Sequence, residues 1–143
     1  MSTEGAAARE MPIIHRIFRR QFAEVRTLMQ EVPAADTARV GAVADHLVFL
    51  LDGLHMHHTT EDDLIWPKLL DRTELDAPLV ERMEEQHQQI DASVAEVRAA
   101  TQAWRSDPTP ATSSSISCLH VESWTPGSAS CSAGTRSRRP TPR

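Results

Sequence analysis

The chain has 143 residues, a formal net charge of -5 and no run of about 18 apolar residues, so we expect one domain and no membrane-spanning helix. Hydrophobic residues make up 40% of the chain, which is enough to bury a core, and the acidic balance argues against nucleic acid as a partner. The N-terminus lacks the apolar run of a signal peptide, so we expect a cytoplasmic protein with neither membrane nor nucleic-acid partners.

Prolines and a capping residue divide the chain into three predicted helices. The first helix is expected over 12–32, with a proline in its first turn and another directly after its end. The second is expected over 37–66, because Asp36 is a good N-cap and Pro67 closes the segment. The third is expected over 77–104 and is followed by a further proline.

Each predicted helix carries one stripe of residues spaced alternately by three and four, which is the period of a helical face. The stripes are His15, Phe18, Phe22, Val25, Met29 and Val32; Val40, Val43, Leu47, Leu50, Leu54, His57, Glu61 and Leu64; and Val80, Met83, His87, Ile90, Val94, Val97, Thr101 and Trp104. These mostly apolar faces must meet in a core. The sequence therefore predicts an all-α, up-down antiparallel helix bundle.

Three histidines, His15, His57 and His87, interrupt the stripes at one level of the predicted bundle. Counted from the helix connections at about 1.5 Å per residue, antiparallel neighbours place them within roughly 5 Å along the axis. Glu61 lies one turn beyond His57 on the same face. Buried imidazole and carboxylate groups are costly unless paired, and one metal ion would satisfy all four. We therefore predict a site for iron, manganese or zinc; the alternative is core histidines bonded to the backbone or to Glu61.

Other polar residues nearby are interpreted as neighbours of this site. His46, His55 and His58 lie off the stripe, so we expect them to be solvated or, for His58, to donate a hydrogen bond to a ligand carboxylate. Asp62 and the aspartate that follows it are expected to face water. Glu84, one turn before a stripe histidine, is expected to be solvated or at best an extra ligand.

The composition changes after residue 110. Residues 1–110 carry 11 basic and 19 acidic side chains, whereas residues 111–143 carry four arginines and one acid. The later segment also holds 9 of the 12 serines and both cysteines. Such a composition buries too little apolar surface to offset chain entropy. We therefore predict a helical domain over 10–110 and a low-complexity tail without stable structure over 111–143.

The residues of the predicted site resemble the hemerythrin-like (HHE cation-binding) family, in its bacterial, actinobacterial type. The resemblance depends on the order His15, His57-x-x-x-Glu61 and His87, and on the surrounding segments HRIFRRQF, LHMHHTTEDDLIWPKL and MEEQHQQI. It covers residues 10–108. The spacing of the three segments together makes the resemblance quite specific.

The resemblance implies a four-helix up-down bundle that holds a non-heme di-iron centre. By motif match, His15, His57, Glu61 and His87 would be iron ligands, and Glu61 would bridge the two irons. Members of the family bind or sense O₂, or react with nitric oxide or peroxide. We therefore expect a small diatomic gas or peroxide as the partner, with binding or sensing rather than enzymatic turnover.

The tail departs from the family, whose fourth helix brings a second His-x-x-x-Glu. We expect that pair around residue 131, where the sequence reads GSASCSAGT; His120 falls about 11 residues early, or ~16 Å along a helix. The tail is interpreted either as an out-of-frame or misjoined end or as a genuine extension. If the fourth helix is missing, the chain is a three-helix remnant without a competent di-iron site, inert or a helical interaction module. Such a remnant would self-associate through the exposed apolar groove.

Overall fold

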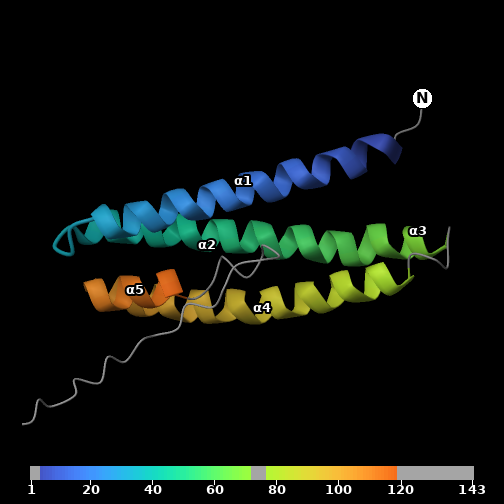
Figure 1. Cartoon of the computed structure of the whole chain (residues 1–143). Coiled ribbons are helices and arrows are strands. Elements are labelled where there is room, and N and C mark those ends of the chain that lie inside the picture. Colours follow the sequence, from blue (N-terminus) through green and yellow to red (C-terminus); the bar gives the residue numbers. More distant parts are fainter. Residues whose placement is uncertain (1–3, 72–76, 119–143) are drawn as a thin grey trace, which may run out of the picture.

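The computed structural model describes residues 4–71 and 77–118, and all regular secondary structure in these two ranges is helical. In chain order the elements are α1 (Glu4–Glu31), α2 (Thr37–Thr60), the π-helical turn η1 (Glu61–Ile65), α3 (Trp66–Leu70), α4 (Ala77–Ser106) and α5 (Pro110–Cys118). The long helices α1, α2 and α4 run up and down side by side (Figure 1). The predicted all-α antiparallel bundle is therefore confirmed.

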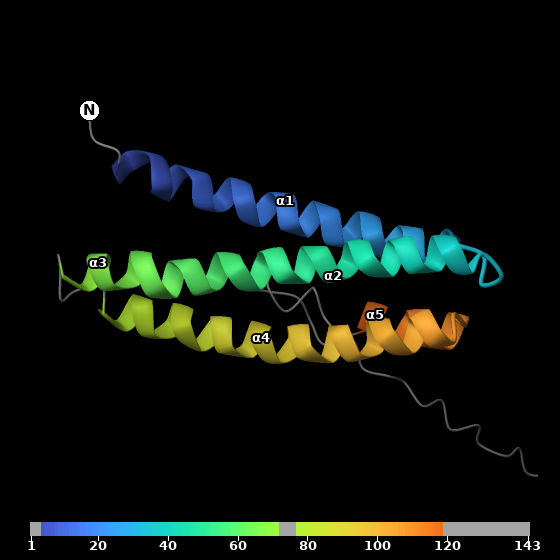
Figure 2. The ribbon, with the colours of Figure 1, turned by 180° about the vertical axis from the view of Figure 1, so that it is seen from behind.

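Helix α2 is the middle helix of the bundle. It contacts α1 on one side and α4 on the other, and both views show it between them (Figure 2). One apolar core is formed by side chains of the predicted stripes, by Ala44 and Leu51, which lie outside them, and by Ile116 of α5. Its members are Phe22, Val25, Met29, Val40, Val43, Ala44, Leu47, Leu50, Leu51, Leu54, Val94, Val97, Trp104 and Ile116. Because α2 is covered on two sides, it buries a wider arc than a single stripe.

The helix ends agree with the prediction at some positions and differ at others. Asp36 is the N-cap of α2, and its side chain accepts a hydrogen bond from the backbone N–H of Arg39 at 3.0 Å. Helix α1 begins at Glu4, so the prediction that it starts at Pro12 is wrong, and Pro12 lies inside the helix. The residues before Pro12 include three alanines, which are strong helix formers and favour this extension.

The prediction that Pro67 closes the second helix is also wrong. After α2 the helix widens into η1, where the backbone N–H of Trp66 bonds to the carbonyl of Glu61, and α3 then continues to Leu70. Pro67 sits in the first turn of α3, where its missing N–H costs little. The wider turn changes the helical register after Glu61, and Leu64, predicted to lie in the core, is 55% exposed.

The first residues of the segment predicted to be a tail form helix α5, which differs from the prediction. Thr109 and Thr112 cap its first turn reciprocally: each hydroxyl accepts a hydrogen bond from the other residue's backbone N–H. Helix α5 contacts α4 and α1, and its Ile116 is only 7% exposed. A capping threonine followed by proline was the local signal for this helix. His120 and the segment around residue 131, where the second His-x-x-x-Glu pair was expected, lie outside the described residues.

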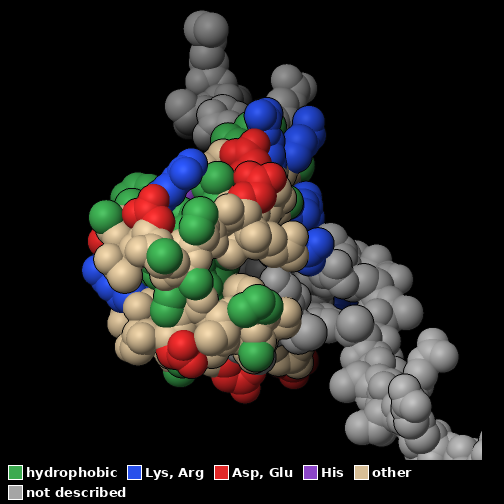
Figure 3. Space-filling model, turned by 90° about the vertical axis from the view of Figure 1, so that its left-hand side faces the viewer, with side chains coloured by type: hydrophobic (Ala, Val, Ile, Leu, Met, Phe, Trp, Pro, Cys, Tyr) green, Lys and Arg blue, Asp and Glu red, His purple; other side chains and the backbone are tan. Residues whose placement is uncertain are grey.

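Apolar side chains also remain on the surface. A groove of about 610 Å³ lies between α1 and α2, and the exposed side chains of Ile17, Phe49 and Met56 are among those that line it. At the end of the bundle where α1 connects to α2, hydrophobic and charged side chains are mixed (Figure 3). No helix in the described part of the chain is long and apolar enough to span a membrane.

Candidate metal centre

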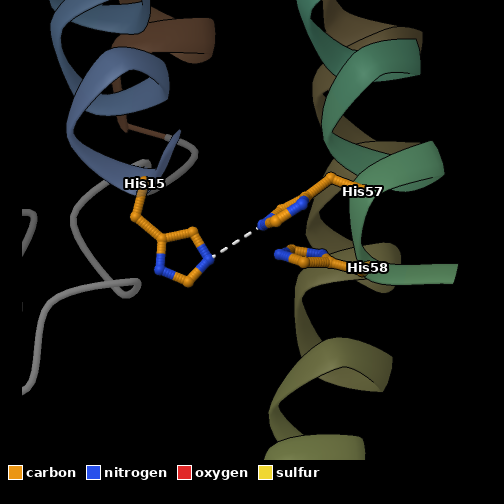
Figure 4. A group of neighbouring side chains, drawn as sticks. All are labelled: His15, His57 and His58. Carbon is orange, nitrogen blue, oxygen red and sulfur yellow. Dashed lines mark hydrogen bonds between the residues drawn. The ribbon is translucent and has the colours of Figure 1, made fainter. Parts of the chain in front are cut away.

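Four histidines and one glutamate from four elements meet between the long helices. His15 comes from α1, His57 and His58 come from α2, Glu61 begins η1, and His87 comes from α4. The Nε2 atoms of His15 and His57 are 3.1 Å apart (Figure 4). The structure therefore brings together the four residues predicted from the stripes, and it adds His58 to them.

Glu61 lies at the centre of this cluster and is only 2% exposed. Its Oε1 atom is 3.0 Å from Nε2 of His57, and its Oε2 atom is 3.4 Å from Nε2 of His87. Oε1 is fully buried and receives no hydrogen bond. One buried carboxylate thus faces histidines of two different helices, and one of its oxygens has no donor.

Neighbouring side chains in the cluster are spaced like ligands of a common cation. Donor atoms bound to one metal at about 2.0–2.2 Å lie ~3.0–3.4 Å from one another in tetrahedral or octahedral arrangements. The separations of His15 from His57, His57 from Glu61 and Glu61 from His87 all fall in this range. Because Oε1 of Glu61 also has no hydrogen-bond donor, the residues present fit a metal ion.

Asp62 accepts a hydrogen bond from the ring of His87, so the prediction that Asp62 faces water is wrong. Its Oδ1 atom accepts a hydrogen bond from Nδ1 of His87 at 2.7 Å and another from Nε1 of Trp66 at 2.8 Å. The π turn explains the difference, because it directs two successive carboxylates, Glu61 and Asp62, toward α4. With Nδ1 protonated, Nε2 of His87 presents its lone pair toward Glu61.

His58 differs most from its prediction. It is only 4% exposed, its ring stacks on that of His87 with centroids 4.2 Å apart, and its Nδ1 atom is buried without a hydrogen-bond partner. A ring nitrogen from each of His15, His57 and His58 lies within 4.8 Å of the other two. The sequence carried a signal for this position, because a second run with the same spacing reaches it: Val40, Ala44, Leu47, Leu51, Leu54, His58 and Glu61.

The other candidates lie at the surface as expected. Glu84, His46 and His55 are exposed. His55 is paired through its Nδ1 atom with Asp91 at 2.9 Å. These side chains do not contribute to the central cluster, although His55 is one turn from His58 on the same helix.

Burial sets the protonation of the cluster. It lowers the pKa of His15 and of His57 below the usual 6.5, and neighbouring positive charge adds to the effect. Burial, followed by the nearby histidines, lowers the pKa of His58 to about 4. Burial and the charge of Asp62 raise the pKa of Glu61 from 4.5 to about 7. At neutral pH these three imidazoles are neutral and are therefore available as metal ligands.

A cleft of about 240 Å³ leads to the cluster between α1 and α4. His15, His58 and His87 line it, and apolar side chains such as Phe18 and Met83 form other parts of its wall. The cleft is large enough for a small molecule to reach the imidazoles.

The fold and this cluster define a helical bundle with a candidate cation site. The family model of the hemerythrin HHE cation-binding domain matches residues 8–122, which is most of the chain. The chain therefore belongs to this family, and the match includes α5 and extends past residue 110. No curated protein and no solved structure was found to match the chain. That the chain belongs to the narrower bacterial, actinobacterial type of this family stays a prediction.

Proposed function

We propose that this protein binds iron at His15, His57, Glu61 and His87, and that the centre takes up a small ligand such as O₂, nitric oxide or peroxide. The observation that supports this most strongly is the buried carboxylate of Glu61, whose Oε1 lies 3.0 Å from Nε2 of His57 and has no hydrogen-bond donor. A mixture of neutral imidazole and carboxylate donors suits iron. Bound iron would supply the open coordination position at which the small ligand binds.

The arrangement of Glu61 supports a di-iron centre. Oε1 faces His57, which lies beside His15, whereas Oε2 faces His87 from the other side. One carboxylate can therefore contribute to two metal positions. Asp62 orients His87 for this role, because a carboxylate on the far ring nitrogen fixes the tautomer and the ring direction.

The lining of the cleft favours binding or sensing over enzymatic turnover. Besides the histidines, the described residues that line it include apolar side chains, one amide, Gln86, and one charged group, Arg19. Few of these groups can donate or accept a proton during a reaction, as turnover would require. The apolar wall suits an uncharged diatomic molecule, and Arg19 would favour an anionic form of peroxide.

The test is optical spectroscopy of the chain loaded anaerobically with Fe(II) and then titrated with nitric oxide or O₂. We expect the wild type to form a coloured adduct and Glu61→Gln, which keeps the side chain's shape but removes its charge, to lose most of it. Glu84→Gln is the matched control, because Glu84 is an exposed glutamate near the same site. A wild type that retains no iron and forms no adduct would support the alternative, a helical remnant without a competent centre.

A further inference from the structure

We propose that His58 is an additional ligand of this metal centre, contributed by α2 beside His57. The inference rests on the proposed function, because it concerns the same metal. It goes beyond the ligand set that the sequence predicted, which consists of His15, His57, Glu61 and His87. The juxtaposition of His15, His57 and His58 is shown in Figure 4.

The first observation is a buried nitrogen that lacks a partner. His58 is 4% exposed, and its Nδ1 atom has no hydrogen bond. A buried polar atom without a partner destabilises the folded chain, because it has lost its hydrogen bonds to water. Among the described residues, Oε1 of Glu61 is the other buried side-chain nitrogen or oxygen atom without a hydrogen-bond partner. Both side chains belong to the cluster described above, and His58 shares with His15 and His57 a group whose ring nitrogens lie within 4.8 Å of one another.

The second observation is the direction in which α2 presents two successive histidines. His57 faces α1, where it meets Nε2 of His15 at 3.1 Å, and His58 faces α4, where its ring lies 4.2 Å from that of His87. The middle helix is covered on both sides, so adjacent residues can both point into the bundle. His58 thus lies between the histidines of α1 and α4, and it lines the same cleft as His15 and His87.

A packing role for His58 makes a different prediction from a ligand role. If the ring of His58 only packed against that of His87, an apolar ring of similar shape would serve equally well, both for the stability of the metal-free chain and for the affinity for metal. As a ligand, His58 lowers the stability of the metal-free chain and raises the affinity for metal. The variant His58→Phe separates the two roles, because it keeps a stacked ring and removes both nitrogens.

The experiment measures Co(II) binding, by its visible absorption, and metal-free thermal unfolding on the same samples. We expect His58→Phe to bind Co(II) more weakly by on the order of 100-fold or more, above the effect typical of residues that only orient ligands. Its metal-free form should melt at the same or a higher temperature than the wild type. His55→Phe is the matched control and should bind Co(II) like the wild type, because His55 is exposed and paired with Asp91.

Wild-type affinity and an unchanged Co(II) spectrum in His58→Phe would overturn the inference and leave the proposed function intact. No Co(II) or Fe(II) binding by the wild type would overturn both. If His58→Phe does not fold, paramagnetic NMR of the Co(II)-loaded wild type decides the question. Shifted imidazole N–H signals from four histidines rather than three are expected if His58 is a ligand, and signals from three would refute it.

Discussion

Nδ1 of His87 lies 2.7 Å from Oδ1 of Asp62, a residue that comes 25 positions earlier in the chain. This contact joins α4 to the π turn that follows α2, and it leaves Nε2 of His87 free to face Glu61. The carboxylate therefore fixes which ring nitrogen is available to a metal. Comparable contacts in metal sites tune both ligand orientation and basicity.

Replacement of Asp62 by alanine should weaken metal binding by about 10–100-fold, because His87 would lose the partner that fixes its tautomer. The measurement is a Co(II) or Fe(II) titration of the purified chain. Asp63→Ala is the control, because Asp63 is the adjacent carboxylate and is exposed. Equal affinities in the two variants would contradict a positioning role for Asp62.

The buried carboxylate of Glu61 should make the stability of the metal-free chain depend on pH. Its pKa is raised from 4.5 to about 7, so the folded chain holds this proton over a range in which the unfolded chain has lost it. The contribution of Glu61 to the free energy of unfolding is therefore fully present below about pH 4.5 and is lost as the pH rises through 7. At about 1.4 kcal/mol per pKa unit, it amounts to roughly 3 kcal/mol at most.

Urea unfolding of the wild type and of Glu61→Gln, in the presence of a chelator, measures this effect. The wild type should lose stability relative to Glu61→Gln between about pH 4.5 and 8. The histidines, whose lowered pKa values act in the opposite direction, are present in both chains, so the difference isolates Glu61. A stability difference that does not change with pH would rule out a raised pKa for Glu61.

The sequence predicted the level at which the site histidines meet, because His15, His57 and His87 interrupt regular stripes and short connections align antiparallel helices. It did not predict His58, because one stripe was assigned to each helix, whereas the middle helix buries a wider arc. Leu51 and Leu54, both buried, lie on the second run that leads to His58. The number of stripes that a helix buries depends on how many helices pack against it, and the sequence of one helix considered alone does not show that number.

The π turn is the other feature that the sequence pattern missed. A regular helix past Glu61 would keep Leu64 on the core face, but the wider turn moves Leu64 outward and directs Asp62 toward His87. Hydrophobic spacing assumes a constant number of residues per turn, so it fails beyond such a turn. Helix α5 was missed for a different reason, because average composition masked the local capping signal at Thr109 and Pro110.

Gly53 is a place where the fold can be stabilised without a change at the centre. It lies inside α2, and a methyl group there would contact the ring of Phe18 at 3.6–3.7 Å, which is ordinary van der Waals distance. Because glycine disfavours helix interiors, Gly53→Ala should raise the free energy of unfolding by about 0.5–1 kcal/mol in a denaturant titration. Gly53→Leu should lack this gain, since its larger side chain meets the ring of Phe18. A loss of stability in Gly53→Ala would contradict the packing described.

Helix α5 should contribute measurably to the stability of the bundle. Ile116 is buried, and it lines a small cavity with Phe22, Met29 and Val97. Ile116→Ala should lower the free energy of unfolding by about 2–3 kcal/mol, whereas the exposed neighbour Ser115→Ala should have little effect. If both variants unfold like the wild type, α5 does not pack on the core in solution.

The measurement that tests the central claim most directly is the iron content of the chain after anaerobic Fe(II) loading and desalting. It should be made on the wild type and on the double variant His57→Ala, Glu61→Ala, with circular dichroism as a check on folding. We expect the wild type to retain iron and the folded double variant to retain almost none, because the variant loses the carboxylate that faces both histidine groups. Equal iron content in the two chains would contradict the proposed metal centre.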